Sequence, residues 1–330
     1  MTAPSHLLRP DRKPSAEGVE RAAHKIAAIL PLTPLMPLEV DGYTIWCKAE
    51  CLQPIGAFKI RGGWHRLTDL TDEQQEKGVV AFSSGNHAQG VAWAAQKLGI
   101  AAVIIMPSDA PAAKMQATKQ MGAEVITYDR MTGSREAMAA DIAEQTSATI
   151  VPSFDDPWII EGQGSCGFEI REQMIARTGH APDQLIACCG GGGLAAGSAL
   201  ANLEAEVIVV EPEGWDDMRH SLERGEIVPV SDNPPPTRCD ALQTMRVSPL
   251  TFEVLHQRGA KGITVTEAEV EHAMRVAFAK LHLVLEPGGA VALAAVLAGK
   301  VPLTDHTAIT LSGGNVDPAL YAQILANGDG

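Results

Sequence analysis

The chain has 330 residues, of which 45% are hydrophobic and 20% charged, a balance typical of a soluble globular protein with one large domain or two packed lobes. Its 40 acidic and 26 basic residues give a formal charge of -14, which argues against a nucleic-acid partner. The apolar runs are too short for a membrane span or a signal peptide, so we expect a cytoplasmic protein with no membrane partner and with its six cysteines reduced.

Short apolar, β-branched runs alternate with longer helical patterns along the chain. Several of these runs are apolar throughout, which predicts an α/β protein whose parallel sheets are covered by helices on both faces. The predicted strands are residues 43–49, 78–82, 101–106, 124–128, 184–188, 206–210, 263–265 and 307–311. The predicted helices are residues 88–98, 112–121, 134–145, 159–175 and 267–281. Consecutive prolines mark residues 231–236 as a loop.

Lys59 lies between Phe58 and Ile60 in a mostly apolar segment, GAFKIRG. Burial lowers the pKa of a lysine, and the neutral amine is the form that makes a Schiff base with an aldehyde. Most lysines in such a setting instead extend to solvent. The segment alone leaves both interpretations open.

Residues 83–90, SSGNHAQG, directly follow a predicted strand and open a predicted helix. Small hydroxyls and an asparagine at such a point suit the binding of a carboxylate through N–H and O–H donors. An ordinary helix N-cap explains the pattern equally well, and His87 taken alone is more simply a structural histidine.

Four consecutive glycines, residues 190–193, stand between the apolar run LIACC and the helical pattern LAAGSALANL. Backbone without Cβ atoms can turn sharply and direct several N–H groups at one anion, and the dipole of the following helix favours the same charge. The pattern is neither a Walker motif nor GxGxxG. It favours a phosphate-binding loop over a flexible turn.

Two further segments follow predicted strands. One is LSGGN, residues 311–315. The other is a carboxylate-rich turn, VEPEGWDD, in which Glu211 and Asp217 flank several backbone carbonyls. Such oxygens could hold Mg²⁺ or Ca²⁺, although an exposed acidic turn without a metal is more common.

Taken together and in this order, GAFKIRG, SSGNHAQG, GGGGL and LSGGN resemble the serine/threonine dehydratase and serine racemase family of fold-type II pyridoxal phosphate enzymes. The match runs from residue 32 to residue 315. The resemblance implies a two-lobed, tryptophan synthase β-like fold. Residues 53–150 would form a small substrate-binding domain, and residues 1–52 with 151–330 a large domain that holds the cofactor phosphate. It also implies a homodimer.

The resemblance assigns cofactor roles to particular residues. Lys59 would carry pyridoxal 5′-phosphate as a Schiff base, Phe58 would pack beside the ring, and Asn86 would hydrogen bond its O3′ oxygen. Ser312 would face the pyridine nitrogen, where a hydroxyl stabilises positive charge less than a carboxylate would. The phosphate would be held by the backbone of Gly190, Gly191, Gly192, Gly193 and Leu194.

The resemblance also implies substrate and metal contacts. The residues expected at the substrate are Ser83, Ser84, Asn86, His87 and Arg135. Arg135 could instead be an ordinary surface residue of a helix. The spacing of Glu211, Trp215 and Asp217 matches the divalent-ion site of the family, with the Trp215 carbonyl as a third ligand. Further candidates near the site are Glu286, from EPGGA, and Phe154, Asp155 and Asp156.

The activity implied is that of a lyase. As a dehydratase (ammonia-lyase), the chain would convert serine, threonine, hydroxyaspartate, phenylserine or a similar small amino acid to a keto acid and ammonia. Freed Lys59 would remove the Cα proton. The alternative is a racemase or a bifunctional enzyme, because Lys59 and Ser84 could lie on opposite faces of Cα. A non-catalytic pyridoxal-phosphate-binding protein would require lost catalytic groups, and none is evidently lost. Ala57 departs from the family, which usually has Ser or Thr at that position.

Overall fold

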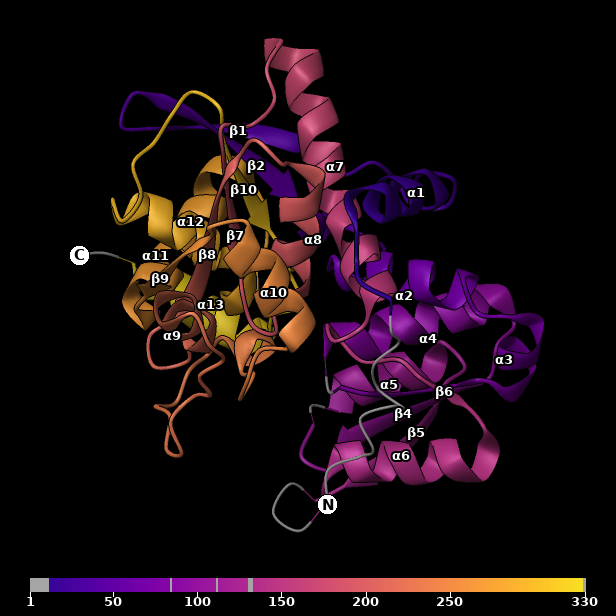
Figure 1. Cartoon of the computed structure of the whole chain (residues 1–330). Helices are drawn as coiled ribbons and strands as arrows, with labels where there is room; N and C mark the ends of the chain where they lie inside the picture. The colour runs from indigo at the N-terminus through magenta and orange to yellow at the C-terminus, as the bar shows by residue number, and fades with distance from the viewer. Residues whose placement is uncertain (1–11, 84, 111, 130–132, 329–330) are drawn as a thin grey trace.

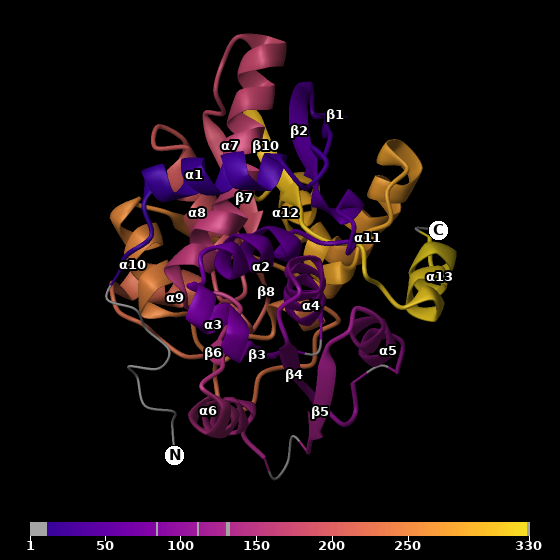
Figure 2. The same cartoon turned by 90° about the vertical axis from the view of Figure 1, so that its right-hand side faces the viewer.

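The computed structural model describes residues 12–83, 85–110, 112–129 and 133–328, and these form two lobes (Figure 1). The larger lobe is built on a six-stranded sheet and the smaller lobe on a four-stranded sheet. Helices flank the sheets of both lobes, as two views at right angles show (Figures 1 and 2). The α/β fold predicted from the sequence is therefore confirmed.

The larger sheet has the strand order β1-β2-β10-β7-β8-β9. Its strands are β1 (Leu35–Val40), β2 (Tyr43–Ala49), β7 (Gln184–Cys188), β8 (Glu206–Pro212), β9 (Lys261–Val265) and β10 (Thr307–Leu311). The pairs are parallel except for β1 with β2, which form an antiparallel hairpin at one edge. Pro37 is tolerated in β1 because an edge strand has one side that makes no ladder hydrogen bonds.

The smaller sheet has the order β5-β4-β3-β6 and is parallel throughout. Its strands are β3 (Val79–Phe82), β4 (Ala102–Pro107), β5 (Glu124–Tyr128) and β6 (Thr149–Ile150). The chain therefore begins in the larger sheet, enters the smaller one, and returns. The domain boundaries at residues 52/53 and 150/151 stay a prediction, because sheet membership alone does not fix where a domain ends.

Helices connect and cover these strands. They are α1 (Ala16–Ala27), α2 (Lys59–Thr68), α3 (Asp72–Lys77), α4 (Asn86–Leu98), α5 (Ala112–Gln120), α6 (Arg135–Thr146), α7 (Pro157–Thr178), α8 (Gly193–Ala201), α9 (Asp217–Arg224), α10 (Pro249–Gln257), α11 (Glu267–Val276), α12 (Pro287–Leu297) and α13 (Pro318–Ala326). The predicted helix over 267–281 ends as a helix at Val276 and continues as a π-helical turn, η4 (Ala277–Leu281). Short 3-10 turns are η2 (Glu50–Leu52) and η3 (Asp240–Leu242).

Helix α7, with 22 residues, packs against both lobes. It contacts α2 on one side and α8 on the other (Figures 1 and 2). Glycines allow the close approach to α8, because a Cβ on Gly164 would lie 2.6 Å from the carbonyl oxygen of Gly197. Asp156 caps the first turn, where Oδ1 accepts a 3.0 Å hydrogen bond from the backbone N–H of Ile159.

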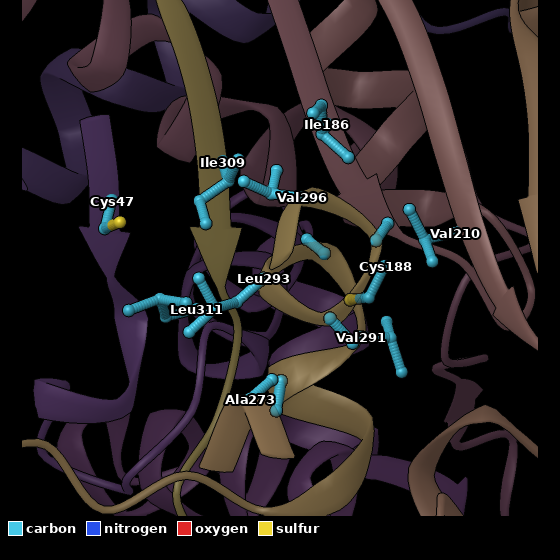
Figure 3. Close-up of a cluster of buried hydrophobic side chains, with 14 of the residues drawn as sticks. Cys47, Ile186, Cys188, Val210, Ala273, Val291, Leu293, Val296, Ile309 and Leu311 are labelled. Carbon is cyan, nitrogen blue, oxygen red and sulfur yellow. The ribbon is translucent and has the colours of Figure 1, made fainter. Parts of the chain in front are cut away.

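The main core of the larger lobe lies between α12 and the sheet (Figure 3). Val291, Leu293 and Val296 of α12 are fully buried, as are Ile309 and Leu311 of β10. The six cysteines are free thiols, and five are buried, which agrees with the predicted reduced state. No helix in the part of the chain that the structure describes is long and apolar enough to span a membrane.

Candidate active site

A pocket of about 330 Å³ lies between the lobes, at the carboxyl ends of strands from both sheets. The segments predicted to act together meet there, although they are far apart in the sequence. The predicted site residues that line it are Phe58, Lys59, Ser83, Asn86, His87, Arg135, Gly190, Gly191, Gly192, Gly193, Leu194 and Ser312. Phe154, Asp155 and Glu286 also line it. Ser84 lies outside the described residues.

Lys59 is the first residue of α2. Its Nζ donates a 2.8 Å hydrogen bond to the carbonyl oxygen of Ser153. Burial lowers the pKa of Lys59 to about 8 from an ordinary value of 10.5. Nζ also lies 5.2 Å from the centroid of the Phe58 ring. A large share of Lys59 side chains is therefore neutral near pH 8, and the amine is held toward one wall of the pocket.

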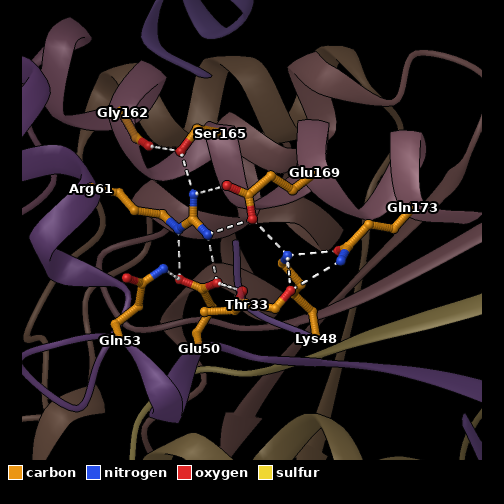
Figure 4. Close-up of polar contacts among 9 residues, drawn as sticks. All are labelled: Thr33, Lys48, Glu50, Gln53, Arg61, Gly162, Ser165, Glu169 and Gln173. Carbon is orange, nitrogen blue, oxygen red and sulfur yellow. Dashed lines mark hydrogen bonds and ion pairs between the residues drawn. The ribbon is translucent and has the colours of Figure 1, made fainter. Parts of the chain in front are cut away.

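A buried polar cluster holds α2 in place two residues after Lys59 (Figure 4). Arg61 donates hydrogen bonds of 2.6 and 2.8 Å to Glu50 and of 2.8 and 2.7 Å to Glu169. Lys48 also donates to Glu169, at 2.6 Å. Arg61, Glu50 and Lys48 are fully buried. These two cations and two carboxylates join α2 to β2, η2 and α7, so the helix that carries Lys59 is tied to the larger lobe and to α7.

The glycine loop runs from the end of β7 into α8. Gly192 has φ +86° and precedes the first residue of α8, a conformation that L side chains rarely adopt. A Cβ on Gly191 would lie 2.2 Å from the ring of Phe154, and one on Gly193 would lie 2.3 Å from Oε1 of Gln163. The loop therefore presents backbone to the pocket and leaves no room for side chains. Leu194, the second residue of α8, is buried beside it.

Ser312 follows β10 and closes the pocket from the larger lobe. Its carbonyl oxygen accepts a 3.1 Å hydrogen bond from the backbone N–H of Phe58, and Gly313 forms a β-bridge with Ala57. The loop that carries Ser312 and the residues just before Lys59 and α2 are thus joined by main-chain hydrogen bonds. Cys188, which the sequence did not mark as a site residue, also lines this wall.

Asn86 and His87 begin α4. Nδ2 of Asn86 donates a 2.6 Å hydrogen bond to Oε1 of Glu286, the residue before α12. Burial and the nearby charge of Lys59 lower the pKa of His87 to about 3, and its Nε2 lies 2.9 Å from the carbonyl oxygen of Val151. His87 is therefore a neutral ring at physiological pH. The Ser83 hydroxyl accepts a 3.2 Å hydrogen bond from the N–H of Gly85 and shapes the same loop.

Arg135 is the first residue of α6 and is 44% exposed. It forms a 2.8 Å ion pair with Glu136 and lies 5.6 Å from the centroid of the Phe82 ring. It lines the pocket while it remains partly in solvent, and its contact with a substrate stays a prediction. Asp156 caps α7 and pairs with Arg66 at 2.9 Å instead of lining the pocket.

The acidic segment begins with Glu211 near the end of β8 and continues to Asp217, outside the pocket between the lobes. The Glu211 carboxylate accepts hydrogen bonds of 3.0 and 2.8 Å from the backbone N–H groups of Met218 and Arg219. Burial and the charge of Asp217 raise the pKa of Glu211, and burial raises that of Asp217 to about 7. Trp215 is buried and donates through Nε1 to the carbonyl of Pro235 at 2.7 Å.

Sequence reasoning missed several groups around Lys59. Ser153 contributes only its carbonyl oxygen, which accepts from Nζ of Lys59 and, at 3.2 Å, from Nε2 of Gln163. Lys114 of α5 and Asp240 of η3 form a 3.0 Å ion pair at the pocket wall, one from each lobe. Backbone acceptors have no sequence signature, and ion pairs between residues 126 positions apart show no local pattern.

A lysine of lowered pKa and a glycine loop at a helix N-terminus line one pocket, and such groups suit a phosphorylated aldehyde cofactor. The chain belongs to the pyridoxal-phosphate dependent enzyme family, whose model matches residues 28–313. The chain is 38% identical to serine racemase of Schizosaccharomyces pombe over 322 residues, which are 95% of this chain and 98% of that protein.

Two further likenesses point to lyases. An L-threo-3-hydroxyaspartate ammonia-lyase of a Pseudomonas species is 38% identical over 320 residues, with 94% of this chain and 98% of that protein covered. A crystal structure of threonine deaminase from T.th. superposes with a TM-score of 0.84 at 39% identity, covering 92% of this chain and 99% of that one. The predicted family and fold type are therefore confirmed.

Proposed function

We propose that the chain is a pyridoxal-phosphate dependent dehydratase (ammonia-lyase) that converts a small β-hydroxy-amino acid to a keto acid and ammonia. The observation that carries the proposal is the buried amine of Lys59, which faces a pocket with a glycine loop on the opposite lobe. An ammonia-lyase and a threonine deaminase among the similar proteins support the reaction class. Serine, threonine and 3-hydroxyaspartate are the candidate substrates.

The pocket suits the cofactor in shape and chemistry. The glycine loop and Leu194 would hold the phosphate through their backbone N–H groups. Glycine is needed at positions 191 and 193 because Cβ atoms there would collide with neighbouring side chains. Ser312 would face the pyridine nitrogen, Asn86 the O3′ oxygen, and Phe58 one edge of the ring. When bound, the cofactor supplies an electron sink for charge that develops at Cα.

The chain's own groups then account for proton transfer and binding. Lys59 in its free-amine form takes the Cα proton, and the Ser153 carbonyl oxygen, 2.8 Å from Nζ, holds that amine in place. The β-hydroxyl would leave as water with a proton equivalent to the one taken from Cα. Hydrolysis of the remaining unsaturated amine would then consume one water and release the keto acid and ammonia. Ser83, Ser84, Asn86 and His87, at the start of α4, would receive the substrate carboxylate, with His87 as a neutral ring. Arg135 would act at the mouth of the pocket.

A racemase is the second candidate, because serine racemase of Schizosaccharomyces pombe is among the similar proteins. It requires an acid on the face of Cα opposite Lys59, the role proposed for Ser84. The test is a substrate panel with keto acid and ammonia measured together, followed by chiral chromatography of the remaining amino acid. Keto acid with equimolar ammonia supports the dehydratase. D-serine formed from L-serine without keto acid would replace it with the racemase.

We further propose a Mg²⁺ or Ca²⁺ site at Glu211, the Trp215 carbonyl and Asp217. Two buried carboxylates of raised pKa lie together, and Oδ1 of Asp217 has no hydrogen-bond partner among the described residues. A hard cation would compensate both charges. The homodimer and the cytoplasmic location stay predictions, of which light scattering on the purified protein tests the first.

A further inference from the structure

Asn86 is held by side chains on both of its polar atoms. Its Nδ2 lies 2.6 Å from Oε1 of Glu286, and its Oδ1 lies 2.8 Å from Nδ2 of Asn315. Asn315 belongs to the loop after β10, and Glu286 precedes α12, so both partners come from the larger lobe. Asn86 belongs to α4 of the smaller lobe. The contact therefore crosses between the lobes at the wall of the pocket.

A backbone carbonyl fixes the donor and the acceptor in the hydrogen bonds that link Asn315, Asn86 and Glu286. The carbonyl oxygen of Ile55 lies 2.8 Å from Asn315 and can only accept, so the NH₂ group of Asn315 must face it. The second hydrogen of that NH₂ group faces two acceptors, Oδ1 of Asn86 at 2.8 Å and Oε1 of Gln89 at 3.4 Å. The shorter contact assigns this hydrogen to Asn86, which presents its oxygen. The NH₂ group of Asn86 consequently faces Glu286, whose carboxylate accepts. One amide hydrogen of Asn86 remains for a partner in the pocket.

The surrounding glycines leave room for this arrangement and no more. A Cβ on Gly56, which has φ +72°, would lie 2.5 Å from Oδ1 of Asn315. A Cβ on Gly313 would lie 2.2 Å from Oε1 of Glu286 and 3.3 Å from Nδ2 of Asn86. Gly56 precedes Lys59 by three residues, and Gly313 follows Ser312. The hydrogen bonds that link Asn315, Asn86 and Glu286 therefore lie between the segment before Lys59 and the loop after Ser312.

We infer that Glu286 and Asn315 are positioning residues, which hold the Asn86 carboxamide in the one orientation that offers an N–H donor to the O3′ oxygen of the cofactor. With the carboxamide turned over, its oxygen would face O3′, and two acceptors would oppose each other. The inference rests on the proposed role of Asn86. It adds two residues that the cofactor need not touch and whose effect must pass through Asn86.

Burial raises the pKa of Glu286 to about 7, against the opposing effect of the Asn86 hydrogen bond. The other titratable groups whose charges act with Glu286 are Asp240, Lys114, Cys51, Cys188 and Cys239. A protonated Glu286 keeps a carbonyl oxygen that accepts from Asn86. Both ionisation states therefore hold the amide, and a glutamine at this position can do the same.

A double-mutant cycle on cofactor affinity tests the inference without any assay of catalysis. Apoprotein of the wild type, N315L, N86A and N86A/N315L is titrated with pyridoxal phosphate, and binding is followed by visible absorbance. We expect N315L to weaken binding roughly twofold to tenfold, the range of one neutral hydrogen bond. We expect no further weakening when N315L is added to N86A, because the effect passes through Asn86.

Asn202 offers a matched control. It is buried, and its Nδ2 donates two 3.0 Å hydrogen bonds to the carbonyls of Gly167 and Ser198, outside the cofactor pocket. N202L should lower the melting temperature and leave cofactor affinity unchanged. If N202L weakens the cofactor as much as N315L does, the effect is one of general stability and the inference fails.

Glu286 gives a second, independent pair of variants, which also serves if N315L does not fold. E286L should weaken cofactor binding, and E286Q should restore it to within about twofold of the wild type, because a glutamine oxygen still accepts from Asn86. The inference is overturned if N315L weakens cofactor binding by the same factor in the wild type and in N86A. It is also overturned if E286L binds the cofactor as tightly as the wild type does. If N86A itself binds the cofactor normally, the proposed role of Asn86 is wrong, which is a separate outcome.

Discussion

The substitution R61M tests whether the buried polar cluster fixes the helix that carries Lys59. Arg61 and Glu50 are both fully buried, and Glu169 is 13% exposed. R61M would leave these two carboxylates with Lys48 as their single cation among the described members of the cluster. Removing one partner from a buried charge pair costs about 3–5 kcal/mol. Against a total stability of about 5–15 kcal/mol, that is a large share.

Urea unfolding followed by circular dichroism measures this loss at pH 7. The exposed pair of Lys261 and Glu206 supplies the control, since Lys261 is 70% exposed and K261M should cost less than about 1 kcal/mol. Cofactor affinity should also fall in R61M, because Lys59 lies two residues away on α2. A loss of stability in R61M no larger than that in K261M would refute the view that this cluster supports the site.

The same variant has a predicted pH dependence. Burial alone would raise the pKa of Glu50, but the charge and hydrogen bonds of Arg61, with Lys48 and Thr33, lower it overall. Ionised Glu50 therefore stabilises the wild type above an ordinary pKa of 4.5, and this stabilisation is lost as the pH falls through the lowered value. In R61M the pKa of Glu50 should rise. The difference in the free energy of unfolding between the wild type and R61M should consequently become smaller as the pH falls.

Three further predictions concern separate parts of the account. G191A should weaken cofactor binding by about 1–3 kcal/mol, because the added Cβ meets the Phe154 ring. Titration of the apoprotein with pyridoxal phosphate measures this affinity, and an unchanged affinity would exclude the glycine loop as the phosphate site. The rate at which apoprotein captures pyridoxal phosphate should rise with pH through a midpoint near 8 and level off above it, since Lys59 reacts as the neutral amine. Stopped-flow absorbance measures this rate, and a midpoint near 10.5 would contradict a buried lysine. In a chelator at pH 8, D217N should have a higher melting temperature than the wild type, because burial raises the pKa of Asp217 to about 7 and the ionised carboxylate destabilises the fold. This difference in melting temperature should become smaller toward pH 5. Added Mg²⁺ or Ca²⁺ should raise the melting temperature of the wild type more than that of D217N.

Much of the fold could be predicted from periodicity alone. The strands at 43–49, 124–128, 184–188 and 307–311 agree with the structure to the residue. For 184–188 and 307–311 the reason is that fully buried parallel strands are short apolar runs with sharp ends. Strand β1 was missed, since Pro37 interrupts its pattern and its pairing is antiparallel at an edge. Helix α2 was missed because Gly62 and Gly63 lower its intrinsic helix propensity.

The candidate site could be predicted as a set of segments but not as a geometry. The four motifs carry the groups that face the pocket, and the structure brings all of them together apart from Ser84, which lies outside the described residues. The supporting groups could not be found. Arg61 was quoted within a motif, yet Glu169 is 108 positions away, and the Ser153 carbonyl is 94 positions from Lys59. Tertiary contacts of this kind leave no periodic trace in the sequence.

The central claim is that Lys59 carries pyridoxal phosphate. Reduction of the reconstituted protein with borohydride converts a Schiff base to a stable secondary amine, and peptide mass spectrometry then locates the pyridoxyl group. We predict one modified residue per chain, Lys59, and no modification in K59A. A pyridoxyl group on another lysine, such as Lys114 at the pocket wall, or none on a protein that binds the cofactor, would contradict the account.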